Sequence, residues 1–278
     1  MIKTVYNILY YAVVVVIITF TVLQFYKPTI VVWLWNNTTI SYTYDNKGVE
    51  DGNLTLYQRS NKPSKSCILW FGGGAFISGS KKGVYGMMNA IHESELNIDQ
   101  ITFTYPLRFD YTLQDMIKSA NDVVLKFKDT YKSFHLIGIS AGALLAGTFA
   151  RKEMLPNTAD HIQVEKLGVT VKSLSFLSPC LSFDFQSSIV AAIAKYYIGR
   201  GTPYLSEYNC NNLHLPTLIV TSVSDPLSEL SKTFSKSNKC TLKTYSDDVT
   251  NHAFMLNMAY KQSHEVISLL VDFIKSND

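Results

Sequence analysis

The stretch from residue 134 to 147 constrains the fold most, because a run of bulky apolar residues turns directly into a run of small ones. Residues 134–139 have the apolar character of a buried parallel strand, and the Ala- and Leu-rich residues that follow favour a helix. Between the two, residues 138–142 fit the pattern G-x-S-x-G. A strand that turns at once into a helix strains its central residue and needs small residues two positions to either side. The sequence therefore predicts a sharp turn that exposes the hydroxyl of Ser140 at the N-terminus of a helix.

A tightly packed strand–helix turn with an incidental serine would explain the same five residues, so the interpretation depends on partners elsewhere. Asp225 and His252 each lie shortly after a predicted strand, at 217–220 and 240–245. Beside a serine nucleophile, a histidine takes the proton from the attacking hydroxyl, and a carboxylate holds the imidazole in the required tautomer. We therefore expect Ser140, Asp225 and His252 to form a catalytic triad. Asp184, which follows an earlier strand, is an alternative acid in a weaker sequence context.

The predicted strand at 67–71 runs into a loop, 72–80, that begins with three consecutive glycines. Glycine permits backbone conformations closed to other residues and lets N–H groups approach a ligand closely. Such a loop is suited to stabilising a developing oxyanion, and we expect the N–H groups of Gly73, Gly74 and Ala141 to receive it. A phosphate-binding loop is the competing interpretation, but no Gly-Lys-Ser/Thr follows and the glycine spacing does not fit a dinucleotide site.

Strands alternate with helices from residue 67 onward, which predicts the α/β class, with a mostly parallel sheet and helices on both faces. Further strands are expected at 101–105, 134–139 and 172–177, and helices at 112–131 and around 266–273. Before them, residues 41–44 and 54–57 alternate as antiparallel edge strands do, with a turn signal at 51–53. With 278 residues, 47% of them hydrophobic, the chain suits one α/β domain with a large core.

Taken together, these motifs make the chain resemble the esterases of the hormone-sensitive-lipase-like group of α/β-hydrolases. The resemblance extends from about residue 67 to the C-terminus. Residues 72–74 resemble the H-G-G-G motif of that group, 138–142 its strand–helix turn, 225–229 its D-P-L-x-D/E signature and 252–254 its H-x-F. The order Ser, Asp, His along the chain is also that of the α/β-hydrolases. Phe71 stands where the group usually has His, although residues 71–80 resemble a cholinesterase-type pattern, Y-G-G-G-F-x-S-G-S, with an aromatic residue there.

The resemblance implies an α/β-hydrolase fold and a serine hydrolase that cleaves carboxylic esters through an acyl-enzyme and needs no cofactor. The alternatives are an amidase or peptidase on the same fold, and a binding protein on a catalytically inactive scaffold. Between the strands at 172–177 and 217–220 we expect a small cap, at about 180–212. Neutral, apolar esters with short to medium acyl chains suit its apolar side chains. The expected substrate-binding residues are Phe76, Ile189, Val190, Ile193, Tyr196 and Tyr197.

Residues 4–26 contain no charged residue, and as a helix they would be about 34 Å long, enough to cross a bilayer core of about 30 Å. We expect residues 1–27 to form an uncleaved signal anchor before a catalytic domain at 28–278. A cleaved signal peptide is the alternative, but no small-x-small cleavage site follows the apolar run. Sequons at Asn36, Asn37 and Asn53 favour a glycoprotein with a lumenal or extracellular catalytic domain. Such an anchored domain is similar to the arylacetamide deacetylases.

The remaining charged and polar residues indicate few other functions. A net charge of +3 without a dense basic run gives no sign of nucleic-acid binding, and no His, Cys or Asp spacing resembles a metal-ligand set. His135 opens a predicted buried strand and is interpreted as structural. Among the four cysteines, Cys210 and Cys240 precede neighbouring predicted strands, so we expect one disulfide between them, with Cys67 as a buried free thiol.

Overall fold

The computed structural model describes residues 13–16, 19, 44–58, 64–78, 80–108, 110–154, 162–183, 206, 208–211 and 213–278. The chain divides into two compact units, Met1–Ser41 and Tyr42–Asp278, and each is considered by itself. In the first unit residues 13–16 and 19 are helical, and most of the anchor expected at 1–27 lies outside the described residues. In the part of the chain that is described, no helix combines the length and the apolar composition needed to cross a membrane.

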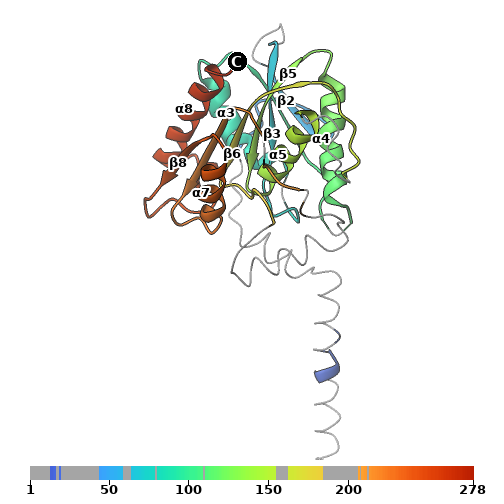
Figure 1. Ribbon diagram of the computed structural model, residues 1–278, viewed down its shortest axis with the longest axis vertical. Helices are drawn as coiled ribbons and strands as arrows, with labels where there is room; N and C mark the ends of the chain where they lie inside the picture. Colours follow the sequence, from blue (N-terminus) through green and yellow to red (C-terminus); the bar gives the residue numbers. More distant parts are fainter. Residues whose placement is uncertain are drawn as a thin grey trace, which may run out of the picture. The chain divides into compact units, whose positions relative to one another are not determined.

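The second unit is built on one sheet, which has eight strands among the described residues, in the order β1-β2-β4-β3-β5-β6-β7-β8 (Figure 1). The strands from β3 to β8 pair in parallel, as predicted, and β1 and β2 add an antiparallel edge. β3, β5 and β7 are buried along their whole length, which is typical of parallel strands covered on both faces. The parallel strands are β3 (Ser66–Phe71), β4 (Asp99–Phe103), β5 (Ser133–Ile139), β6 (Thr170–Leu177), β7 (Thr217–Ser222) and β8 (Thr241–Tyr245).

One strand of the antiparallel edge was not predicted from the sequence. β2 (Leu54–Tyr57) lies where expected, and its partner β1 is Val49–Asp51. Of the strand expected at 41–44, residues 41–43 lie outside the described residues. The turn at residues 52 and 53 explains the pairing of β1 with β2, because it pairs Asp51 directly with Leu54 and places the partner strand immediately before the turn. Gly52 has a φ of 56°, a conformation that glycine adopts without steric cost.

Helices cover both faces of the sheet (Figure 1). The apolar side chains of α4 (Leu113–Phe127), α5 (Ala141–Met154) and α7 (Ser228–Ser237) join one hydrophobic cluster. Those of α3 (Tyr85–Glu93) and α8 (Lys261–Lys275) join a second cluster with the 3-10 turns η1 (Lys81–Val84) and η3 (Phe254–Leu256). The α/β class with two helical layers is therefore confirmed.

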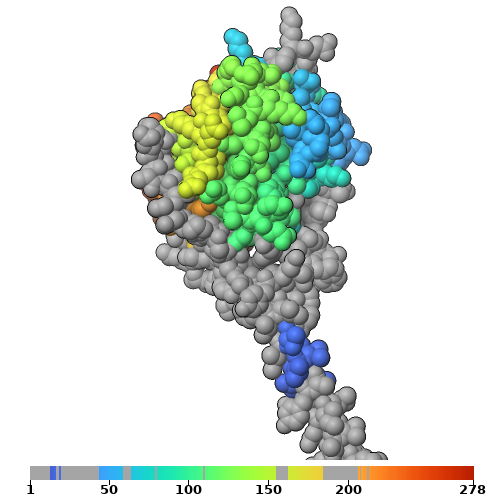
Figure 2. All heavy atoms as spheres, turned by 90° about the vertical axis from the view of Figure 1, so that its right-hand side faces the viewer, coloured from blue at the N-terminus to red at the C-terminus, as the bar shows by residue number. Residues whose placement is uncertain are grey.

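α4 shows how local sequence sets a helix boundary. Its N-cap is Thr112, whose hydroxyl accepts the Asp115 N–H while the Asp115 carboxylate accepts the Thr112 N–H, a complete capping box. The helix ends at Phe127, earlier than the predicted 131, because the chain turns there to bury Tyr131 between Phe127 and Phe134. Figure 2 shows α4 in green on the surface, between the blue β1–β2 edge and the yellow segment before β6.

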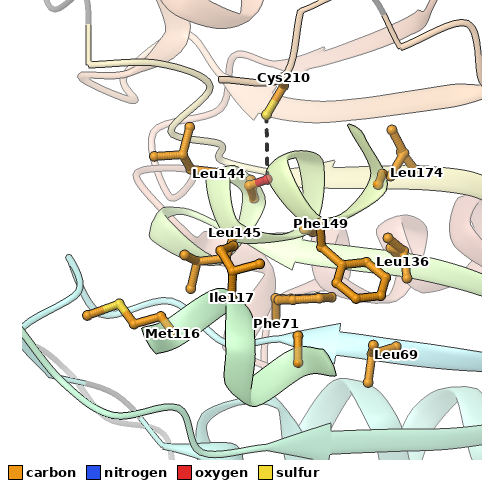
Figure 3. Close-up of a cluster of buried hydrophobic side chains, with 14 of the residues drawn as sticks. Leu69, Phe71, Met116, Ile117, Leu136, Leu144, Leu145, Phe149, Leu174 and Cys210 are labelled. Atoms are coloured by element: carbon orange, nitrogen blue, oxygen red, sulfur yellow. Dashed lines mark hydrogen bonds between the residues drawn. The ribbon is translucent and has the colours of Figure 1, made fainter. Parts of the chain in front are cut away.

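Behind this surface, α4 and α5 are packed against β3 and β5 by interlocking apolar side chains (Figure 3). Phe149 of α5 lies over the sheet with its ring centroid 6.2 Å from that of Phe71. Burying an aliphatic or aromatic side chain of this size stabilises the fold by about 1.5–3 kcal/mol each. The cluster drawn there includes Leu69, Phe71, Met116, Ile117, Leu136, Leu144, Leu145, Phe149, Leu174 and Cys210. This packing holds the start of α5, directly after Ser140.

The expected disulfide between Cys210 and Cys240 is wrong, because all four cysteines are free thiols. Cys210 is fully buried and its thiol is directed at helix α5, with Sγ 3.6 Å from the carbonyl oxygen of Ala143 (Figure 3). A Cβ at Gly147 would lie 2.3 Å from that sulfur, so the helix and the cysteine are in close contact. Cys67 is a buried free thiol, as predicted, and burial raises its pKa.

Candidate active site

The strand–helix turn between β5 and α5 has the predicted strained geometry. Ser140 has a φ of 52°, which only a strongly constrained non-glycine residue adopts. A Cβ at Gly138 would lie 2.4 Å from Ala143 Cα, and a Cβ at Gly142 would lie 2.1 Å from the carbonyl oxygen of Phe71. Both distances are shorter than the contacts that real Cβ atoms make. Only glycine at these two positions lets the backbones of strand, turn and helix pack this closely.

Ser140, His252 and Asp225 meet at the carboxyl ends of their strands, although 112 residues separate the serine from the histidine. His252 Nε2 lies 2.8 Å from Ser140 Oγ. On the other side of the ring, His252 Nδ1 lies 3.0 Å from Asp225 Oδ1. These are hydrogen-bond distances at both ring nitrogens, and they place the imidazole between a hydroxyl and a carboxylate. The three side chains that the sequence picks out as a triad are therefore connected through the ring of His252.

Asp225 is held as a buried carboxylate. Its side chain is inaccessible to solvent, whereas that of His252 is 31% exposed. Burial raises the pKa of Asp225, but the hydrogen bond and charge of His252 and the N–H of Leu227, 2.8 Å away, outweigh it and leave the pKa below its usual value. The carboxylate is thus ionised at neutral pH and can stabilise a positive charge on the ring.

Ser178, at the end of β6, connects the parts of this site and was not singled out from the sequence. Its φ is 44°, its N–H donates to the Val220 carbonyl, and its hydroxyl accepts the N–H of Ala253 at 2.9 Å. It therefore links the ends of β6 and β7 to the residue after His252. Its position directly after a predicted strand was the signal that could have identified it.

The glycine loop, residues 72–78, lies against the same turn. Gly74, Ala75 and Phe76 have φ values of 124°, 51° and 65°, and the loop closes on itself through the Ile77 and Ser78 N–H groups, which donate to the Gly74 carbonyl. A Cβ at Gly73 would lie 3.3 Å from Ser140 Cβ, so this residue lies beside the serine. The expected donors Gly73, Gly74 and Ala141 have no hydrogen-bond acceptor for their N–H groups within the described part of the chain.

Phe71, which stands where the resembled group usually has His, belongs to the core. It is fully buried, with its ring centroid 5.3 Å from that of Phe103 and 6.2 Å from that of Phe149. The Phe71 side chain therefore packs in the core at the start of the glycine loop. The departure from the motif affects the core under the loop rather than the N–H groups of the loop itself.

Of the expected substrate-binding residues, Phe76 is described and is 2% exposed, with its ring against that of Phe183 at 5.8 Å. Ile189, Val190, Ile193, Tyr196 and Tyr197, most of the cap at 180–212 and the alternative acid Asp184 lie outside the described residues. His135 lies apart from the triad, with Nδ1 2.7 Å from Ser173 Oγ. Among the described residues no group of His, Cys, Asp and Glu side chains is arranged to hold a metal ion.

Comparison with solved structures shows the fold to which this geometry belongs. Esterase B from Lactobacillus rhamnosis in an inhibited form superposes with a TM-score of 0.68 at 14% identity, covering 90% of this chain and 93% of that one. An esterase from Pyrobaculum calidifontis gives 0.63 at 15% identity, covering 91% of each chain, and a hormone-sensitive lipase from a metagenome library gives 0.63 at 15%, covering 88% of each. No family model and no curated protein sequence matches the chain.

The chain therefore has the α/β-hydrolase fold, as the motifs predict. The structural likeness extends over about nine tenths of both chains and includes a hormone-sensitive lipase, so the predicted resemblance to that group is confirmed at the level of the fold. A further structure of the Lactobacillus esterase B, with a TM-score of 0.60 at 14% identity, contains a tributyrin phosphonate inhibitor.

Proposed function

We propose that this protein is a serine hydrolase that cleaves carboxylic esters through an acyl-enzyme. The observation that supports it most directly is the continuous contact from Ser140 Oγ through the ring of His252 to Asp225 Oδ1, at 2.8 and 3.0 Å. In this proposal Ser140 attacks the ester carbonyl carbon and His252 Nε2 takes the hydroxyl proton. The buried carboxylate of Asp225 stabilises the imidazolium that forms.

The reaction would then proceed in two halves. His252 returns its proton to the leaving alcohol as the C–O bond breaks, which leaves the acyl group on Ser140. A water molecule, deprotonated by the same ring, attacks the acyl-enzyme and releases the carboxylic acid. In this proposal the N–H groups of Gly73, Gly74 and Ala141, which have no acceptor among the described residues, receive the negative oxygen of each tetrahedral intermediate.

Short-chain, apolar esters are the proposed substrates. Phe76, in the glycine loop, packs its ring against that of Phe183, so the described surroundings of the loop are apolar there. The structural neighbours named above are esterases and a lipase, and one was solved with a phosphonate related to tributyrin, a triester of a four-carbon acid. These similarities favour esters over amides and a working enzyme over an inactive binding scaffold.

The test of this proposal is the site of covalent modification. A fluorophosphonate should react with the full-length protein in a 1:1 ratio, and mass spectrometry of a digest should place the phosphonyl group on Ser140. Prior incubation with p-nitrophenyl butyrate should delay the reaction by occupying the serine. Modification at another serine, or none under conditions that label a known esterase fully, would contradict the proposal.

We also propose that residues 1–27 anchor the hydrolase domain, 28–278, to a membrane, with the domain on the lumenal or extracellular side. The support comes from the sequence, where 23 residues, 4–26, carry no charge and three sequons follow. Asn53, the sequon residue that is described, is exposed in the β1–β2 turn. Full-length protein made in eukaryotic cells should remain in carbonate-washed membranes and should lose mass on glycosidase treatment. Release by carbonate would contradict the anchor. Digestion of the domain by a protease that acts from the cytosolic side of intact membranes would contradict the orientation.

A further inference from the structure

Tyr105 makes a buried contact with the glycine loop that the reaction outlined above does not use. It lies two residues beyond the end of β4, is 5% exposed, and donates its hydroxyl to the carbonyl oxygen of Gly72 at 2.9 Å. Burial raises the pKa of Tyr105, so the hydroxyl keeps its proton, and remains a donor, throughout the range in which an esterase works.

The position of the Tyr105 ring is fixed by its neighbours. Its centroid lies 6.3 Å from that of Phe103, which in turn lies 5.3 Å from that of Phe71, and both pairs meet edge to face. The adjoining backbone is tied down as well, because the Thr104 N–H donates to the Asn53 carbonyl at 2.8 Å and the Thr104 hydroxyl accepts the Lys81 N–H. The hydroxyl is therefore presented to Gly72 from a rigid support.

The Gly72 carbonyl is confined from a second side by the start of α5. A Cβ at Gly142 would lie 2.5 Å from this oxygen, so the oxygen is in close contact with the backbone of the strand–helix turn. The peptide bond between Gly72 and Gly73 is trans and planar, so its N–H points opposite to its C=O. A donor that fixes the direction of the Gly72 carbonyl thereby fixes the direction of the Gly73 N–H.

Resting on the proposed ester hydrolysis, we propose that Tyr105 is a positioning residue that sets the Gly73 N–H toward the oxyanion. Glycine at 72, 73 and 74 leaves the loop backbone with unusually wide conformational freedom, and an external constraint is needed to hold one peptide plane. Tyr105 supplies that constraint without touching the substrate. It lowers the barrier because the negative oxygen develops in the transition state and the tetrahedral intermediate but is absent from the bound ester.

The test compares two hydroxyl deletions in the same core. Tyr105→Phe removes the donor to Gly72, whereas Tyr131→Phe removes a buried hydroxyl that donates to Asp99 Oδ2 at 2.8 Å, away from the triad. In the full-length protein, Tyr105→Phe should lower kcat for p-nitrophenyl butyrate about 10- to 100-fold, since a misdirected oxyanion donor costs that order of rate. KM should stay within about twofold, and the pH profile of kcat/KM should keep its shape, because ground-state binding and the triad are unaltered.

Tyr131→Phe should lower thermal stability about as much as Tyr105→Phe does, because each variant loses one buried hydrogen bond. It should leave kcat within about twofold of the wild type. Equal kcat losses in the two variants, or a Tyr105→Phe variant with wild-type kcat, would overturn the proposal and make Tyr105 a purely structural residue. A rise in KM at constant kcat would do the same, because it would place the effect in ground-state binding.

Amide hydrogen exchange separates this proposal from the proposed hydrolase function. Peptides covering residues 72–78 should exchange faster in Tyr105→Phe than in Tyr131→Phe, whatever the activity. If the wild-type protein proves inactive on esters while the loop is loosened only by Tyr105→Phe, ester hydrolysis is refuted and the Tyr105 constraint stands. If the loop exchanges equally in both variants, the constraint is refuted whatever the wild-type activity.

Discussion

The carbonyl oxygen of Phe71 occupies the space where a Cβ of residue 142 would be, 2.1 Å from its ideal position. The start of the glycine loop and the start of α5 are thus in direct backbone contact. This contact leaves no room for a side chain at residue 142. The contact joins the two backbone segments from which the expected oxyanion donors come.

Gly142→Ala should therefore destabilise the protein by about 3 kcal/mol or more, because the added methyl meets backbone rather than a movable side chain. Urea unfolding followed by circular dichroism measures the change. Gly83→Ala is the matched control: nothing lies within 4 Å of a Cβ at that position, and we expect a change below about 0.5 kcal/mol. Equal stability of the two variants would show that the loop and the helix are not in the contact described.

Asp225→Asn should leave the contacts of residue 225 nearly intact but remove the charge that supports the imidazolium. We expect kcat for short esters to fall by about 10⁴-fold, as when a triad carboxylate is neutralised elsewhere, with KM little changed. His252→Ala should be at least as severe. Stopped assays over hours, with the variants purified away from host esterases, measure the residual rates. A loss below about tenfold in Asp225→Asn would mean that another carboxylate supports the ring.

Asp278 gives the fold a pH-dependent contact far from the triad. Its carboxylate accepts from Lys172 Nζ at 2.9 Å and lies 3.3 Å from His135 Nε2. Burial raises the pKa of Asp278, but hydrogen bonds from Ser66, Lys172 and His135 outweigh it and lower the pKa to about 2 from a usual 3.8. A folded-state pKa below the unfolded one stabilises the fold above about pH 4, and the contribution is lost as the pH falls toward 2.

Asp278→Asn should accordingly lower Tm at pH 7, and the gap to the wild type should close as the pH approaches 2. The side chain is 46% exposed, so the effect should be small, below about 1 kcal/mol after solvent screening. Asp129→Asn, whose carboxylate is 94% exposed, should show no such pH-dependent gap. A gap for Asp278→Asn that persisted or grew at pH 2 would have the wrong sign and would refute the assignment.

The acyl preference of the enzyme follows from the proposed substrate class. Within a series of p-nitrophenyl esters, kcat/KM should be highest for acetyl to hexanoyl chains and should fall for decanoyl and longer ones. Steady-state rates in the absence of detergent or emulsion measure this. Activity that rose steadily with chain length, or that required an oil–water interface, would instead indicate a lipase acting on long-chain substrates.

The sequence predicted the sheet and the triad because both leave short-range signals. Apolar runs at 67–71, 134–139 and 217–220 are long enough to mark buried strands, and the strained turn requires glycine at 138 and 142. Asp225 and His252 lie in the loops that follow β7 and β8, and parallel strands end at one edge of a sheet, so these loops meet there.

Other features depend on contacts that no local pattern records. The roles of Tyr105 and Ser178 arise from single hydrogen bonds between segments 33 and 75 residues apart. The Cys210–Cys240 bridge was expected from strand order alone, which does not tell the direction of a side chain, and Cys210 faces α5 instead. The alternation at 41–44 likewise did not identify the partner of β2, because it does not record the turn register that pairs β2 with Val49–Asp51.

The central claim is tested most directly by measuring p-nitrophenyl butyrate hydrolysis in the wild type, Ser140→Ala and Ser268→Ala. Ser268 is an exposed serine on α8 and serves as the matched control. The wild type and Ser268→Ala should hydrolyse the ester at equal rates, while Ser140→Ala, folded with an unchanged circular dichroism spectrum, should be slower by at least about 10⁴-fold. Hydrolysis by Ser140→Ala at the wild-type rate would contradict the assignment of Ser140 as the nucleophile.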